Sequence, residues 1–139
     1  MSNEDTLRKG LEAFNQHNPQ GFTAMYAEDA IVYDPFYPEP LRGKAAIRKD
    51  MEDFFAAFPD IQMHVANVIA SGDTVAMEAT GAGTHRGPML VPGGEVPPTN
   101  RRMEIRGAIF CRFDAQGQIT EERRYFDTGS IMQQLGLLG

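Results

Sequence analysis

Residues 103–127, MEIRGAIFCRFDAQGQITEERRYFD, decide the fold because they predict two long strands joined by a tight turn. Apolar and polar residues alternate along the first half of this stretch, as in a strand with one buried face. That apolar face consists of Met103, Ile105, Gly107, Ile109, Cys111 and Phe113. The run 114–117, DAQG, supplies the turn. We therefore expect an antiparallel pair whose apolar face looks toward the protein interior.

The second strand of this pair, residues 119–127, mixes charged and aromatic side chains. Strict alternation places Glu121, Arg123, Tyr125 and Asp127 on one face. Such a mixture suits the mouth of a functional cavity, and we expect this face to look into it. A solvated face would explain Glu121 and Arg123 equally well.

The rest of the chain divides into a helical first half and a second half of strands. Apolar residues at helical spacing predict a helix that ends at Asn18-Pro19, a short helix carrying Phe22, Met25 and Tyr26, and a third helix that ends at Pro59. A short strand at 30–33 precedes the third helix. Further strands are expected at 61–69 and 75–84, a long loop at 86–100, and a final helix at about 130–135.

This order predicts an α+β fold in which a curved, cone-shaped antiparallel sheet wraps around three N-terminal helices. A conical cavity is expected between the two layers. The chain has 139 residues and no internal repeat or linker, so residues 1–139 are expected to form a single domain.

Composition excludes several classes of function. The net charge of −6 argues against nucleic-acid binding, which needs a basic face. The single cysteine, Cys111, rules out an intrachain disulfide and suits the reducing cytoplasm. No apolar run is long enough to span a membrane. Three scattered histidines lack metal-site spacing, so we expect no metal and no cofactor.

Several motifs, in order along the chain, resemble known families. Residues 26–48, YAEDAIVYDPFYPEPLRGKAAIR, resemble ketosteroid isomerases. The runs 58–87, 97–101 (PPTNR) and 126–136 (FDTGSIMQQLG) are similar to SnoaL-like polyketide cyclases and the related ester cyclases. Together they cover nearly the whole chain. The resemblance implies the nuclear transport factor two-like fold, an α+β barrel that agrees with the layout predicted above.

The isomerase resemblance implies that Asp34 is a general base, because Asp34 falls at the position of that base in those enzymes. The two oxyanion donors of the isomerases align with Gly10 and about Ile109, which cannot donate from a side chain. We therefore do not expect steroid isomerisation. An aspartate before proline is also ordinary turn chemistry, which is the alternative for Asp34.

The cyclase resemblance implies that Asp127 is the acid/base group, which removes a proton alpha to a carbonyl before an aldol addition. His85, in GTHRG, matches a histidine common in that family and is a candidate proton shuttle. Asp127 could instead cap the final helix, and His85 could be structural. Because more cyclase motifs are present, we expect Asp127 to matter more than Asp34.

These observations predict a cofactor-independent enzyme of the polyketide-cyclase type, a lyase or isomerase acting by acid/base chemistry in an apolar pocket. The expected ligand is small and apolar, polyketide-like or steroid-like. Expected substrate-binding residues are Tyr125, Arg123, Ile109, Phe55, Met103 and Tyr33. One alternative is a non-catalytic module that binds a small ligand or a protein. Another is epoxide hydrolysis, which in this fold uses an Asp-Arg-Asp arrangement. Arg123 and Asp127 could supply two members of that arrangement.

A homodimer is also expected, because the outer face of the 103–113 strand carries an apolar side chain. Glu104, Arg106, Ala108, Phe110 and Arg112 should form that face. Phe110 is too apolar to be fully solvated without cost, so a second copy is the expected cover.

Overall fold

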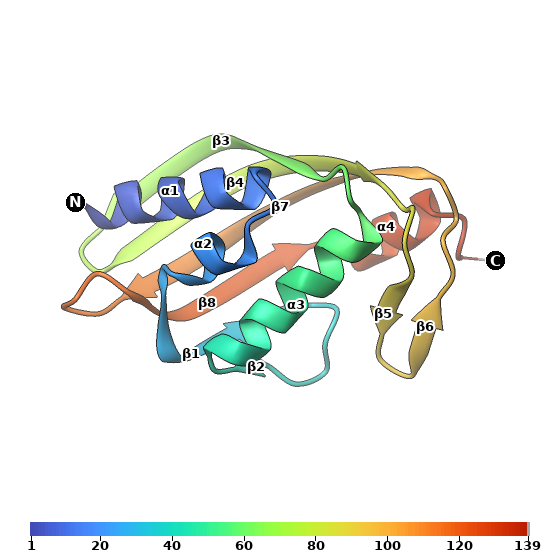
Figure 1. Cartoon of the computed structure of the whole chain (residues 1–139). Helices are drawn as coiled ribbons and strands as arrows, with labels where there is room; N and C mark the ends of the chain where they lie inside the picture. Colours follow the sequence, from blue (N-terminus) through green and yellow to red (C-terminus); the bar gives the residue numbers. More distant parts are fainter. Residues whose placement is uncertain (139) are drawn as a thin grey trace.

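A curved six-stranded sheet is the central element of the computed structural model, which describes residues 1–138 (Figure 1). The helices are α1 (Asn3–Asn15), α2 (Pro19–Thr23), α3 (Lys44–Ala57) and α4 (Thr128–Gln134). The sheet strands are β1 (Tyr26–Tyr33), β2 (Leu41–Arg42), β3 (Gln62–Ser71), β4 (Thr74–Thr84), β7 (Arg102–Phe113) and β8 (Ile119–Phe126). Their spatial order is β2-β1-β8-β7-β4-β3.

The helices begin and end where local chemistry requires. Ser2 caps α1, and its side chain exchanges hydrogen bonds with Asp5 in a capping box. α3 follows Gly43, whose φ of +90° favours glycine, and stops just before Pro59, as predicted. The second helix is shorter than predicted, because α2 ends at Thr23 and Tyr26 already begins β1.

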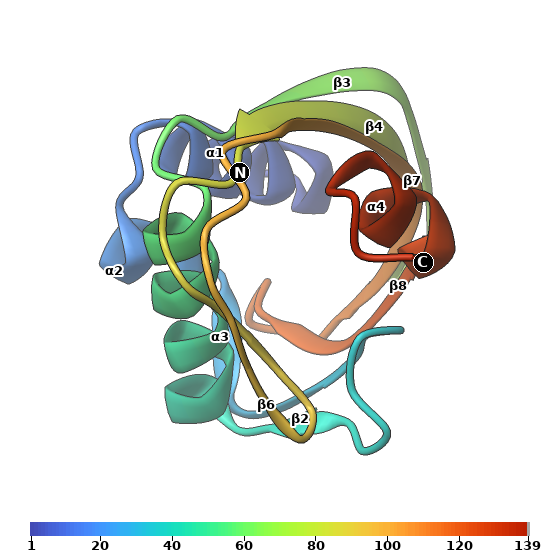
Figure 2. The same cartoon turned by 90° about the vertical axis from the view of Figure 1, so that its right-hand side faces the viewer.

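The sheet and helices form the predicted α+β arrangement, with one difference in strand direction. β3, β4, β7 and β8 pair antiparallel in chain order, but β1 lies parallel to β8. No short turn joins β1 to β8, so no hairpin imposes an antiparallel direction on this pair. Figure 2 shows the sheet curving around one side of the molecule while α1 and α3 close the other.

A β-bulge in β8 overturns the face predicted for this strand. Phe113 pairs with Ile119 but Arg112 pairs with Glu121, so Thr120 is an extra residue on β8. One extra residue moves every later side chain to the opposite face. Glu122, Arg124 and Phe126 therefore look inward. Glu121, Arg123 and Asp127 were predicted to face the cavity but lie away from it, so the prediction is wrong for these three; Tyr125 is exposed but still contributes to the cavity wall.

A small hairpin occupies the segment expected to be a loop. β5 (Met89–Val91) pairs with β6 (Gly94–Val96) around Gly93, which has a φ of +91°. β5 packs against α3, and Gly87 makes the approach possible because a Cβ there would collide with the Ala56 carbonyl. Among residues 1–138, no helix is both long and apolar enough to cross a bilayer.

Candidate active site

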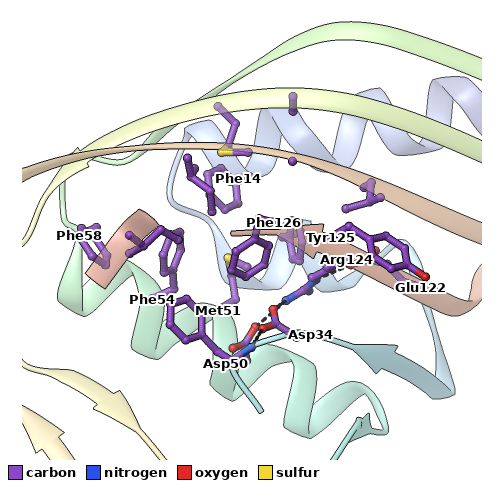
Figure 3. Close-up of a pocket in the computed structure, with 18 of the residues that line it drawn as sticks. Phe14, Asp34, Asp50, Met51, Phe54, Phe58, Glu122, Arg124, Tyr125 and Phe126 are labelled. Atoms are coloured by element: carbon purple, nitrogen blue, oxygen red, sulfur yellow. Dashed lines mark hydrogen bonds and ion pairs between the residues drawn. The ribbon is translucent and has the colours of Figure 1, made fainter. Parts of the chain in front are cut away.

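A cavity of about 190 Å³ lies between the concave face of the sheet and the N-terminal helices. Most of its wall is apolar and comes from α1, α3, β4, β5 and β7. Phenylalanines and methionines predominate, among them Phe14, Phe54, Phe58, Met51, Met77 and Met103. Polar side chains gather at one place on this wall, where β8, α3 and the end of β1 meet (Figure 3).

The polar group is built around the guanidinium of Arg124, whose side chain is 11% exposed. Its Nη1 lies 3.0 Å from Asp34 Oδ2 and 3.1 Å from Asp50 Oδ2. Its Nε donates to Glu122 Oε2 at 2.6 Å. We call these four residues the Arg124 cluster. Their attraction keeps the guanidinium charged, and the neighbouring carboxylates raise the pKa of Arg124 against the effect of burial.

The Asp34 side chain takes part both in the turn after β1 and in the cavity wall. It directly follows β1, and its Oδ1 accepts the Phe36 N–H at 2.8 Å, which is the turn chemistry expected before Pro35. Its Oδ2 meets Arg124. The side chain is 7% exposed, and this burial raises the pKa of Asp34 despite the attraction of Arg124. Asp34 can therefore hold and release a proton at a higher pH than an exposed aspartate.

Asp50 brings a second carboxylate into the same wall from α3. Its Oδ1 accepts the Tyr37 hydroxyl at 2.6 Å while Oδ2 faces Arg124. Burial and the nearby Asp50 raise the pKa of Tyr37, so this phenol stays a donor. Two carboxylates thus converge on one nitrogen, Arg124 Nη1, at the edge of an apolar cavity.

Glu122 anchors the guanidinium from the interior of the sheet. The carboxylate is 2% exposed and accepts the Tyr26 hydroxyl at 2.7 Å and the Cys111 thiol at 3.4 Å. Burial raises the pKa of both donors, so each remains protonated. Cys111 is therefore a buried hydrogen-bond donor, with no thiolate for nucleophilic chemistry.

One guanidinium nitrogen, Nη2, has no acceptor among residues 1–138. A guanidinium has five N–H groups, and three of them point to Asp34, Asp50 and Glu122. Nη2 donates to no protein acceptor in residues 1–138 and is not among the buried unpartnered atoms. Because Arg124 lines the cavity, an N–H group of its Nη2 is available to an oxygen placed there.

The structure brings only some of the predicted site residues together. Met103 and Ile109 line the cavity, as expected from the inward face of their strand. Phe55 is half-buried and stacks on His17 instead of lining the cavity. Tyr33 and Arg123 lie on the outer face, where the guanidinium sits 4.5 Å from the ring centroid.

Asp127 is exposed and is not part of the cavity wall. Its Oδ1 accepts the Ser130 N–H at 3.1 Å and caps α4, the alternative that the sequence left open. Tyr125 contributes to the cavity wall, but it is 55% exposed and its ring meets Phe110 edge-on at the outer face. The catalytic role predicted for Asp127 thereby loses its geometric basis.

His85 is fully buried at the end of β4 and does not line the cavity. Its Nδ1 accepts the Thr99 N–H at 3.2 Å and lies 3.0 Å from the Thr99 hydroxyl. Burial lowers the pKa of His85, which favours the neutral ring. Through Thr99, His85 ties the end of β4 to the segment after β6.

The residues that sequence reasoning missed are Arg124, Asp50 and Glu122. Asp50 carried a readable signal, because it lies on the same helical stripe as Ile47, Met51 and Phe54. A charged residue within an apolar stripe marks a buried polar site. Arg124 and Glu122 carried no such signal, since their inward orientation depends on the bulge at Thr120.

The described residues contain no group of three or more His, Cys, Asp or Glu side chains that could hold a metal ion. The acidic residues of the Arg124 cluster use their oxygens for the guanidinium, Tyr26, Tyr37 and the backbone. The arrangement is suited to proton transfer by carboxylates beside a fixed positive charge.

Comparison with known proteins identifies the class and then the family. Solved structures with this architecture include a protein from Catenulispora acidiphila described as having a ketosteroid isomerase-like fold, in complex with trimethylamine (19% identity, TM-score 0.77, covering 95% of this chain and 92% of that one). The chain therefore has the ketosteroid isomerase-like fold. Residues 4–135 match the model of the SnoaL-like polyketide cyclase family, and the chain belongs to that family.

Two structures of higher identity come from streptomycetes. IdmH from Streptomyces antibioticus, a putative polyketide cyclase, is 28% identical with a TM-score of 0.78 and covers 98% of this chain and 99% of its own. AclR from Streptomyces galilaeus, a putative hydroxylase, is 25% identical with a TM-score of 0.83 and covers 99% and 97%. A search of curated proteins gave no match.

The buried anchor of Arg124 gives a test of stability. We expect Glu122→Ala to lower the free energy of unfolding by about 3–5 kcal/mol, because it leaves the guanidinium and Tyr26 without their buried acceptor. Chemical denaturation measures this. The control is Glu121→Ala, which removes a partly exposed pair with Arg123 and should cost no more than about 1 kcal/mol. Equal effects of the two substitutions would contradict the buried anchor.

Proposed function

We propose that this chain catalyses a cofactor-independent acid/base reaction on a small carbonyl compound, with Asp34 as the proton-transferring group. The observation that carries the proposal is the convergence of Asp34 and Asp50 on Arg124 Nη1 at the edge of an apolar cavity. Paired carboxylates in an apolar pocket favour an enzyme over a passive binding module. Membership of the SnoaL-like family supports a cyclase-type reaction.

The proposed reaction begins with loss of a proton alpha to a carbonyl. The Asp34 carboxylate takes that proton, and negative charge develops on the carbonyl oxygen. One N–H group of Arg124 Nη2 donates to this oxygen, in the role of an oxyanion-hole donor. The enolate carbon then adds to a second carbonyl of the same molecule, closing a ring. Protonated Asp34 returns the proton to the new alkoxide, so the enzyme is regenerated.

Asp50 and Glu122 act in this proposal through Arg124. Glu122 holds the guanidinium at Nε and Asp50 holds it at Nη1, so the orientation of the free nitrogen Nη2 is fixed. Preorganised donors of this kind do not have to reorient as charge develops. Tyr37 in turn fixes Asp50 by its hydroxyl.

A pair of asparagine variants tests which aspartate transfers the proton. We expect Asp34→Asn to slow exchange of the alpha protons of 1-tetralone in D₂O by on the order of 10²-fold or more, because an amide cannot accept the proton. Asp127→Asn should leave the rate unchanged, since asparagine is an equally good helix cap. Mass spectrometry follows the exchange, and melting curves confirm folding. Full activity in Asp34→Asn would reject the proposal; no exchange by the wild type would favour the non-catalytic binding module.

Epoxide opening is the second candidate, and a specific observation favours it. Asp34, Arg124 and Asp50 form an Asp-Arg-Asp arrangement, although with different residues from the Arg123 and Asp127 suggested by the sequence. Here protonated Asp34 would donate to the epoxide oxygen while Asp50 takes a proton from the attacking water. Incubation with cyclohexene oxide tests this candidate. Diol formation that Asp50→Asn abolishes would support it, and no diol above the uncatalysed background would reject it.

We further propose that the outer face of the sheet pairs with a second copy of the chain. Phe110 is 45% exposed and lies edge-on to Tyr125, with ring centroids 5.9 Å apart. Both rings leave apolar surface in water, which a dimer would cover. We expect light scattering after size exclusion to give a dimer at micromolar concentration, and Phe110→Asp to give a monomer. A monomeric wild-type chain would contradict the proposal.

A further inference from the structure

The cavity is small for the kind of ligand that the family name suggests. Its volume is about 190 Å³. An engineered interior cavity of about 150 Å³ binds benzene, whereas pockets for drug-sized ligands span roughly 300–1,000 Å³. The space therefore fits one ring, or two fused rings, and is too small to enclose four fused rings.

The cavity wall can change its shape more easily than it can change the volume that it encloses. Six methionines line the cavity, namely Met25, Met51, Met63, Met77, Met89 and Met103. Unbranched thioether side chains can repack around ligands of different outline. Five of them, Met25, Met51, Met77, Met89 and Met103, are almost fully buried against the core, so the wall behind them cannot recede far. Such a wall discriminates between ligands by their volume more than by their shape.

The charge of the Arg124 cluster restricts the ligand further. One guanidinium faces three acidic residues, Asp34, Asp50 and Glu122. The cluster remains net negative even when one of the acids carries a proton. A carboxylate or phosphate ligand placed beside it would meet like charge at low dielectric, which is costly. A neutral oxygen can accept from Arg124 Nη2 without that cost.

We infer that the substrate is a neutral ketone of one or two rings, bound with its oxygen on Arg124 Nη2 and its rings among the methionines. This inference rests on the proposed function, because that function assigns the oxygen to Arg124. It goes beyond that function by excluding anionic substrates and substrates of four fused rings. The binding energy comes mainly from burial of the ring, and the oxygen sets the orientation.

Three probes of different charge and ring number test the inference. Isothermal titration compares 1-tetralone, a neutral two-ring ketone, with 1-naphthoate, which has a similar frame and a negative charge. The third probe is androst-4-ene-3,17-dione, a neutral ketone with four rings. We expect 1-tetralone to bind more tightly than either by on the order of tenfold or more. Equal or tighter binding of 1-naphthoate or of the steroid, or no binding of 1-tetralone, would overturn the inference.

A cavity-filling variant locates the binding. Ala79 lies on β4, is 4% exposed and lines the cavity, so Ala79→Leu should weaken 1-tetralone binding on the order of tenfold. Thr80→Leu, on the outward face of the same strand, is the matched control and should not change it. If Ala79→Leu does not fold, Met77→Ala replaces it and should narrow the difference between 1-tetralone and the steroid. Unchanged affinities in the folded variant would overturn the inference.

Ligand binding and proton exchange are measured independently, so failure of the proposed ligand class can be told apart from failure of the proposed function. If 1-tetralone binds selectively but its alpha protons do not exchange faster than in buffer, the proposed acid/base function fails and the ligand class stands. If exchange is catalysed but 1-naphthoate or the steroid binds as tightly, the ligand class fails and the function stands.

Discussion

The buried guanidinium of Arg124 is the interaction on which the site depends. It joins three separate parts of the fold, because Glu122 lies on the same strand, Asp50 on α3 and Asp34 just after β1. Burying several charges costs free energy that ion pairing offsets only with good geometry and further hydrogen bonds. Tyr26, Tyr37 and the Phe36 N–H supply those bonds. Loss of any one acid would leave a buried donor unpaired.

A single extra residue decides which charges meet at this cluster. The bulge at Thr120 turns Glu122 and Arg124 inward, and leaves Glu121 and Arg123 to pair on the outside. Without it, the inward pair would be Glu121 and Arg123. The same bulge therefore creates the cluster and exposes the aromatic surface proposed for dimerisation. Bulges beside functional sites commonly re-aim side chains in this way.

The sequence predicted the elements better than the site. The first helix, the third helix with its stop at Pro59, and the inward face of residues 103–113 follow from local pattern, and the structure confirms them. The resemblance to ketosteroid isomerases made Asp34 a candidate, and its place before Pro35 predicted a turn; both signals are local in the sequence. The inward turn of Arg124 and the parallel pairing of β1 could not be predicted, because they depend on a bulge and on long-range strand pairing. Asp50 was readable from its helical stripe.

The ionisation of Asp34 tests the central claim most directly. Its pKa is raised from 3.8 by burial, so the folded chain binds this proton more tightly than the unfolded chain does. The stabilising contribution of this group is present below pH 3.8 and is lost as the pH rises through the raised pKa. Carbon-13 NMR of the side-chain carboxyls, assigned with Asp34→Asn, measures the midpoint. Asp60, whose pKa is lowered by the Thr84 N–H, is an internal reference. We expect Asp34 to titrate above 3.8 and Asp60 below it; a midpoint of Asp34 at or below 3.8 would contradict the account.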